Sequence, residues 1–279
     1  MSLNSKYTYD GEFVKLLTRR TDIDLVLAAL ELARDAYPDL RFEQTFDWID
    51  ERAAELSSRI AGAKTERDAL AALADCLSGR HGLQGDRDSY NHADSSYLHR
   101  VIERKRGIPI SLSLLYMAVG ARAGLPLHGV SSPGHFMVRY EAVDGPLFID
   151  AFSRGEVLTH DECSARICRA MDLPGPLAES AFEPAPARTI VIRMLNNLKA
   201  LHARQSNWQA AWLVQHRLSA LHPSTYSEIR DLGLISLKAN RPGMALDLLQ
   251  SCRQRCPEDE TEMLDQHVSE AERQLVRWN

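Results

Sequence analysis

Residues 107–126, which read GIPISLSLLYMAVGARAGLP, decide the fold of this 279-residue chain. Pro109 is suited to open a helix, because proline lacks the N–H group that has no partner at the first helical position. Gly124 stands where glycine commonly ends a helix, and Pro126 follows it. Most faces between these two ends are apolar, so the sequence predicts a buried central helix from Ile110 to Ala123.

A small sheet is expected after this helix. Three short runs of β-forming residues, at 127–131, 136–140 and 147–149, are separated by turns that contain glycine and proline. Alternation along the second run suits one face of an antiparallel sheet. Residues 156–171 are then predicted to be helical, and the proline-rich segment 174–187 has the composition of a linker.

Helices are also expected upstream of the central helix. Apolar residues recur at helical spacing through residues 12–35, where Thr21 and Asp22 are plausible caps between two helices. The further helices are predicted at 39–60, 65–78 and 96–105, with a polar, glycine-containing loop at 79–96.

The C-terminal third contains an internal repeat of 34 residues. The matching positions are Leu198 and Leu232, Ala211 and Ala245, and Pro223 and Pro257. This period, with small residues where helices pack and proline after the second helix, resembles the tetratricopeptide family over about residues 190–257. A helix at about 261–276 would cap the open end. The alternative is a helical bundle whose spacing matches by coincidence.

Composition restricts the classes of function. The formal net charge of −5 disfavours sequence-independent binding of nucleic acid, which needs a basic face. Five scattered cysteines argue against a disulfide framework and for a reducing compartment. No run of 18 apolar residues and no N-terminal export pattern occur, so we expect a cytoplasmic protein without a membrane partner.

His135 and Asp150 are the candidate chemical pair. His135 begins one predicted strand and Asp150 ends the next, so the two can face each other on antiparallel neighbours. A carboxylate beside an imidazole fixes its tautomer and supports a general base. The other interpretation is a buried histidine that the carboxylate satisfies for structural reasons. Ser111 and Ser113 could supply a nucleophile, or they could bond the backbone at the start of the central helix.

Several separated motifs carry a resemblance to the transglutaminase-like superfamily and, more narrowly, to the bacterial SirB-type proteins. They are Asn91, Ser96-Tyr97-Leu98, Gly107 to Ser113, Gly134-His135-Phe136 and Ile149-Asp150-Ala151-Phe152. The resemblance implies an α+β fold: a mostly helical, papain-type domain with a small antiparallel sheet at 1–180, then an all-α tetratricopeptide-repeat segment at 188–279. It also implies binding roles for Asn91, Ser96, Tyr97, Pro109, Phe136 and Phe152.

The departure from the family pattern concerns the nucleophile. Active members of the superfamily open the central helix with a cysteine, at the position that Pro109 or its neighbours hold here. No cysteine lies between Cys76 and Cys163. The His135–Asp150 pair therefore carries over by motif, and the thiol does not.

Two functions are consistent with this sequence. The first is a non-catalytic, transglutaminase-like protein that binds a protein or peptide partner or acts as a scaffold. The second is a hydrolase or acyl transferase that uses Ser111 or Ser113 with His135 and Asp150. Neither function requires a cofactor. No metal site is expected, because the histidines and cysteines lack the usual ligand spacings.

Overall fold

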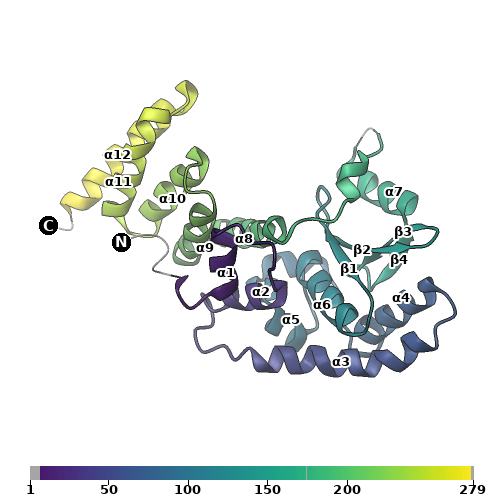
Figure 1. Cartoon of the computed structure of the whole chain (residues 1–279). Helices are drawn as coiled ribbons and strands as arrows, with labels where there is room; N and C mark the ends of the chain where they lie inside the picture. The colour runs from purple at the N-terminus through teal and green to yellow at the C-terminus, as the bar shows by residue number, and fades with distance from the viewer. Residues whose placement is uncertain (1–6, 174, 278–279) are drawn as a thin grey trace. The chain divides into compact units, whose positions relative to one another are not determined.

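The computed structural model describes residues 7–173 and 175–277, and packing divides the chain into two compact units (Figure 1). One unit is Thr21–Met194. The other joins Met1–Arg20 to Leu195–Asn279. This grouping differs from the predicted ranges 1–180 and 188–279, because the first helix packs with the C-terminal helices. The domain ranges 1–180 and 188–279 stay a prediction.

Helices form most of the unit Thr21–Met194. They are α2 (Leu25–Ala33), α3 (Glu43–Ala61), α4 (Glu66–Ala74), α5 (Leu98–Arg104), α6 (Pro109–Arg122) and α7 (His160–Met171). The cap of α2 is Asp24, whose carboxylate accepts the N–H groups of Val26 and Leu27 at 2.9 and 3.0 Å. The caps suggested at Thr21 and Asp22 were wrong, because α2 begins only at Leu25 and Asp24 provides its cap.

Helix α6 is the buried element that the sequence predicted. It begins at Pro109, and all but three of its fourteen residues are buried. Its C-terminal turn is closed by Gly124, whose φ of +88° lies in the left-handed region that favours glycine. Both ends therefore follow from local chemistry.

The sheet has four antiparallel strands in the order β1 (Leu127–Val130), β2 (Met137–Ala142), β3 (Gly145–Asp150) and β4 (Glu156–Thr159). Residues 156–159 were predicted to be helical, and that was wrong. They pair with β3, and the helix starts only after Thr159, whose side chain caps it in a reciprocal capping box with Glu162.

Helices cover both faces of the sheet (Figure 1). Since side chains alternate along a strand, Met137 and Phe148 point to the face where α7 packs, in a buried cluster with Cys163 and Ile167. Val138 and Ile149 point to the opposite face, on which α6 lies. Asp150 is the last residue of β3, and its side chain binds Arg166 of α7.

The proline-rich segment 174–187, predicted to be a linker, packs against the sheet in its described part. Phe182, in the short 3₁₀ helix Glu179–Phe182, is buried against the ring of Phe148, with centroids 5.8 Å apart. The carbonyl of Phe182 accepts a hydrogen bond from Arg139 at 2.9 Å, and that of Ala181 accepts one from Ser132 at 2.7 Å. The described part of this segment therefore completes the core on the α7 face.

The second unit has the helix pairs of a tetratricopeptide array. Helix α8 (Ala187–Arg204) leads into it, and the others are α9 (Trp208–Leu221), α10 (Tyr226–Lys238), α11 (Pro242–Cys252) and α12 (Thr261–Val276). The repeat positions Ala211 and Ala245 are completely buried between helices. The α+β class and the all-α repeat segment are confirmed.

Helix α1 (Gly11–Leu17) belongs to this second unit. The buried side chain of Arg217 on α9 donates to Asp10 at 2.8 Å and lies over the rings of Tyr7 and Phe13, at 4.7 and 4.8 Å. Tyr7 also bonds His216 at 2.5 Å. Contacts between the two ends of the chain therefore hold this unit together.

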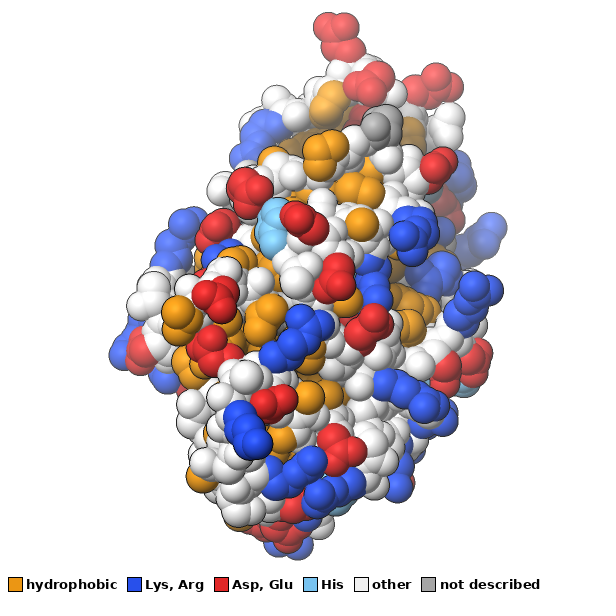
Figure 2. Space-filling view, turned by 90° about the vertical axis from the view of Figure 1, so that its right-hand side faces the viewer, with side chains coloured by type: hydrophobic (Ala, Val, Ile, Leu, Met, Phe, Trp, Pro, Cys, Tyr) orange, Lys and Arg blue, Asp and Glu red, His pale blue; other side chains and the backbone are white. Residues whose placement is uncertain are grey.

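Basic and acidic side chains are interspersed on the face that Figure 2 shows, with scattered hydrophobic side chains between them. Among the described residues, no helix has the length and apolar character needed to cross a bilayer.

Candidate functional site

His135 and Asp150 lie beside each other at the ends of two neighbouring strands. The β2–β3 register pairs Val138 with Ile149, so His135, which precedes β2, comes close to the residue that ends β3. His135 Nε2 lies 3.1 Å from Asp150 Oδ1. The imidazole and the carboxylate are thus in direct polar contact.

Asp150 is surrounded by donors. Its Oδ1 accepts the backbone N–H groups of Phe152 and Ser153, both at 3.1 Å. Its Oδ2 accepts the Ser153 hydroxyl at 2.9 Å and the Arg166 guanidinium at 3.0 Å. Arg166 comes from α7 and also binds Glu156 at 2.7 Å. The carboxylate thus ties β3, the following turn and α7 together.

The ionisation of Asp150 follows from this environment. Burial alone would raise its pKa, because a charged carboxylate loses hydration in the interior. His135, Arg166 and the N–H of Ser153 outweigh that effect and hold the pKa well below its usual range. Asp150 is therefore a carboxylate anion at neutral pH.

The start of α6 holds no nucleophile in contact with His135. Pro109 has no reactive side chain and is buried. The Ser111 hydroxyl is engaged with backbone carbonyls, those of Ser95 at 2.6 Å and Ile108 at 3.0 Å. Ser113 Oγ is buried and makes no hydrogen bond to any described residue, His135 included. Their part as nucleophiles stays a prediction.

Arg193, near the start of α8, reaches the same loop. Its guanidinium donates to Ser131 Oγ at 2.8 Å and to the carbonyls of Ser132 and His135 at 2.7 and 3.0 Å. It lies 5.7 Å from the centre of the Phe136 ring. No carboxylate within the described residues pairs with it. Burial lowers its pKa, while the nearby Tyr90 acts in the opposite direction.

The predicted binding residues differ in access to solvent. Four of them are buried: Ser96, Tyr97, Pro109 and Phe136. Asn91 is exposed, and its side chain donates to Asp88 at 3.3 Å. Phe152 is half-buried, with its ring 6.0 Å from that of Tyr90. Asn91 and Phe152 are thus the ones that reach solvent, and the binding role of all six residues stays a prediction.

Sequence reasoning missed Arg166, Arg193 and Tyr90. The two arginines lie on helices far from His135 in sequence, and one arginine in an amphipathic helix carries no local motif. Tyr90 was treated as part of a polar loop. Burial is the main reason that the pKa of its hydroxyl is raised; the charge of Arg193 acts to lower it, and that of Asp150 acts to raise it. The Tyr90 ring lies 6.0 Å from that of Phe152, which follows Asp150 closely in the chain.

His92 and Asp94, two residues apart in the loop before α5, pair with different side chains. His92 Nε2 pairs with Asp88 at 2.8 Å. Asp94 binds Arg100 and Arg104 at 3.1 and 2.9 Å and accepts the Tyr37 hydroxyl. The carboxylates of Asp88 and Asp94 are therefore bound to different partners and do not form one ligand set.

Comparisons with known proteins agree with this architecture. Residues 43–196 match the model of the transglutaminase-like superfamily, and residues 198–275 match a tetratricopeptide-repeat model. A UPF0162 protein of Xylella fastidiosa strain 9a5c is 34% identical over 88% of this chain and 85% of its own length. Protein SirB1 of Salmonella typhimurium is 23% identical over 91% of this chain and 94% of its own.

Part of a eukaryotic protein is also similar. The human F-box only protein 21 is 29% identical over 72% of this chain, which corresponds to 31% of that longer protein. A transglutaminase-like domain followed by tetratricopeptide repeats, which generally mediate protein interactions, fits a binding or scaffold role. The chain belongs to the transglutaminase-like superfamily, in the bacterial SirB-type family that joins this domain to tetratricopeptide repeats.

Proposed function

We propose that this protein is a non-catalytic binding module. Its transglutaminase-like unit would recognise an anionic group beside His135, and its repeats would bind a protein partner. The observation that carries the proposal is the combination of an intact His135–Asp150 pair with a helix α6 that begins at Pro109. A general base without a nucleophile cannot form the acyl-enzyme of this superfamily, because the attacking atom is missing.

The bonding of Asp150 supports the same conclusion. A triad carboxylate serves to orient the histidine by accepting its ring N–H. Here the carboxylate is also held by Arg166, Ser153 and two backbone N–H groups, so most of its bonds are made to groups other than His135. These bonds fix the chain after β3, which is a structural task.

Arg193 indicates the chemistry of the ligand. A guanidinium that is partly removed from water and bonded only to neutral oxygens retains an unbalanced positive charge. Arginine binds carboxylates and phosphates through parallel N–H bonds. The His135 carbonyl accepts one of its bonds, and the Tyr90 hydroxyl acts on its pKa. We therefore infer a ligand that presents a carboxylate, such as a peptide C-terminus or an acidic side chain.

A matched pair of probes tests this ligand. In an NMR titration of the ¹⁵N-labelled full chain, N-acetylglycine should shift the Arg193 side-chain signal and the amides of Ser131–Phe136. N-acetylglycinamide, which lacks the charge, should not. Arg193→Gln should abolish the response, whereas Arg154→Gln, on an exposed arginine, should keep it. Equal shifts with both probes would contradict recognition of a carboxylate.

The repeat unit offers a separate groove of about 410 Å³ between α10 and α12. Leu234 and Leu237 give it an apolar part, and the remaining lining is polar: Lys238, Asn240, His267, Glu270, Gln274 and Arg277. A mixed lining of this kind suits an amphipathic segment of a partner protein. We propose that the partner binds here.

Site-specific photo-crosslinking tests the groove. A benzoylphenylalanine at Gln274 should crosslink a discrete partner in cells, whereas the same residue at the exposed Asp247 of α11 should not. Crosslinks of equal yield from both positions would count against this groove.

Labelling with a fluorophosphonate tests the absence of catalysis. The purified chain should stay unlabelled under conditions that label a control serine hydrolase. Labelling that disappears in Ser111→Ala or Ser113→Ala and in His135→Ala would overturn the non-catalytic proposal and establish the serine mechanism.

A further inference from the structure

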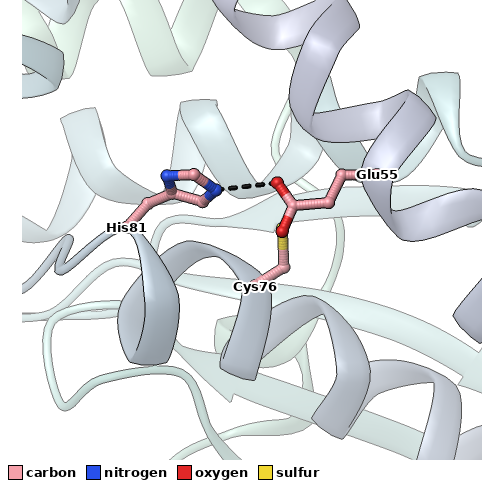
Figure 3. A group of neighbouring side chains, drawn as sticks. All are labelled: Glu55, Cys76 and His81. Carbon is pink, nitrogen blue, oxygen red and sulfur yellow. Dashed lines mark hydrogen bonds and ion pairs between the residues drawn. The ribbon is translucent and has the colours of Figure 1, made fainter.

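Three metal-ligating side chains converge in the unit Thr21–Met194, away from His135. They are Glu55 on α3 together with Cys76 and His81 (Figure 3). One ligand atom of each lies within 4.8 Å of the other two. His81 Nε2 and Glu55 Oε2 are 2.8 Å apart, and the Cys76 thiol approaches the same carboxylate. The cluster thus combines sulfur, nitrogen and oxygen ligands.

The local backbone explains how Cys76 and His81 come together. Residues five apart in a regular α-helix point about 140° away from each other. Here α4 continues into a π-helix, Asp75–Arg80, and the N–H of His81 bonds the carbonyl of Cys76 at 3.1 Å. The wider turn brings residues i and i+5 onto one face. Such π-turns occur frequently at functional sites.

We propose that Glu55, Cys76 and His81 bind a divalent transition-metal ion, with zinc the best match. Thiolate, imidazole and carboxylate are the zinc ligands of proteins, and bond lengths of about 2.0–2.3 Å place tetrahedral ligands roughly 3.5 Å apart. The three side chains reach that spacing with small movements. The Cys76 proton leaves to solvent as the metal enters, and the neutral His81 ring carries its one proton on Nδ1 while Nε2 binds the metal.

Access and charge suit such a site. Cys76 is 1% exposed and forms its floor, while the side chains of His81 and Glu55 are 28% and 29% exposed. A metal can therefore enter from solvent, and a water can take the fourth position. Zn²⁺ with a thiolate, a carboxylate and a neutral imidazole has no net charge. The nearby guanidiniums of Arg80 and Arg52, at 3.0 and 3.4 Å from Glu55, then meet no repulsion from a net positive centre.

The sequence predicted no metal site because the spacing between Cys76 and His81 matches no common zinc motif. Cys76 and His81 come close enough to share a metal ion only because the residues between them form a π-helix. Glu55 comes from the preceding helix, and no local pattern connects it to the other two.

The test measures metal binding by the purified full chain after chelation and dialysis. Competition with a chromophoric chelator gives zinc affinity, and Co²⁺ gives a thiolate-to-metal charge-transfer band that reports the cysteine directly. The expected result is one equivalent of metal and a Co²⁺ band. His81→Gln should weaken zinc affinity at least about 100-fold, because mutating even a residue that only hydrogen-bonds to a metal ligand lowers metal affinity 10- to 100-fold. Cys76→Ser should remove the band.

Cys252→Ser, a substitution of another buried cysteine outside the cluster, is the matched control and should bind like the wild type. His81 is partly exposed, so His81→Gln should fold, as circular dichroism will check. Binding that is unaffected by His81→Gln, or a Co²⁺ complex without a thiolate band, would overturn the proposal.

Discussion

At the scale of single residues, Asp150 is the charge on which the site is built. Asp150→Asn keeps the shape of the side chain but replaces one acceptor oxygen with an amide donor that faces Arg166 and Ser153. Removing one partner of a buried ion pair is strongly destabilising, so we expect a loss of about 3 kcal/mol in the free energy of unfolding. Denaturant unfolding monitored on the Thr21–Met194 unit measures it.

Asp161→Asn is the control, because that carboxylate is fully exposed and should change little. The pKa of Asp150 is depressed in the folded state, so its stabilisation is complete above the unfolded value of about 4 and is lost as pH falls toward the folded value. The stability gap between wild type and Asp150→Asn should therefore narrow below about pH 4. A stability difference that stays constant down to acid pH would show that the charge of Asp150 does not cause the destabilisation of Asp150→Asn.

The two serines of α6 give opposite expectations. Ser111→Ala removes a hydroxyl that bonds backbone carbonyls in the interior, and should destabilise by about 1 kcal/mol. Ser113→Ala removes a buried hydroxyl without a hydrogen-bond partner among the described residues, and should be neutral or stabilising. Urea denaturation of both variants compares them. The reverse order would mean that Ser113 has a bonding role that its surroundings do not reveal.

The sequence predicted the site's two motif residues and not their neighbours. His135 and Asp150 stand beside turns at strand ends, where short motifs and strand pairing restrict their position. Arg166 and Arg193 reach the same place from two helices, and long flexible side chains leave no trace in local sequence. Ser111 shows a further limit: its residue type fits both a nucleophile and a backbone-bonding helix residue, and only the hydrogen bonds separate the two.

At the scale of elements, the repeat unit depends on close approach of α10 and α11. A Cβ added at Gly233 would lie 2.8 Å from Leu249 Cδ2, which is closer than packing allows. We expect Gly233→Ala to destabilise the unit by about 1–3 kcal/mol through overpacking. The change in the thermal unfolding midpoint, followed by circular dichroism, measures this.

Gly243→Ala is the matched control. Gly243 lies in the first turn of α11, and an added Cβ would meet nothing within 4 Å. Alanine is the better helix former, so this variant should be stabilised by up to about 1 kcal/mol. Two variants with the same loss of stability would argue that helix contact at Gly233 is not the cause.

Prediction of elements succeeded where both ends of an element are marked locally. Helix α6 has proline at its start and a left-handed glycine after its end, and it was predicted correctly. Strand β4 has four residues, too few to show an alternation, and exists because β3 offers a free edge. Phe182 lies in a segment with linker composition, yet an aromatic side chain next to an open apolar face is buried regardless of the prolines around it.

At the scale of the whole molecule, residues near the N-terminus fold with the C-terminal helices. This association cannot be seen in sequence, because Asp10 and Arg217 are separated by 207 positions and belong to no shared motif. Tetratricopeptide units bury their faces by stacking neighbours, and a short array has an open end on each side. Helix α1 packs against α9 and so supplies apolar surface that a further repeat would otherwise provide.

A pair of aromatic substitutions in the N-terminal segment tests this association. Phe13 is 1% exposed and Tyr9 is 90% exposed. Phe13→Ala leaves a cavity beneath Arg217 and should cost about 3–5 kcal/mol in the second unit. Hydrogen exchange of the α9 amides should accelerate, while the α6 amides of the other unit keep their protection. Tyr9→Ala should change neither. Loss of protection in α6 alone after Phe13→Ala would show that the N-terminal helix stabilises the transglutaminase-like unit instead.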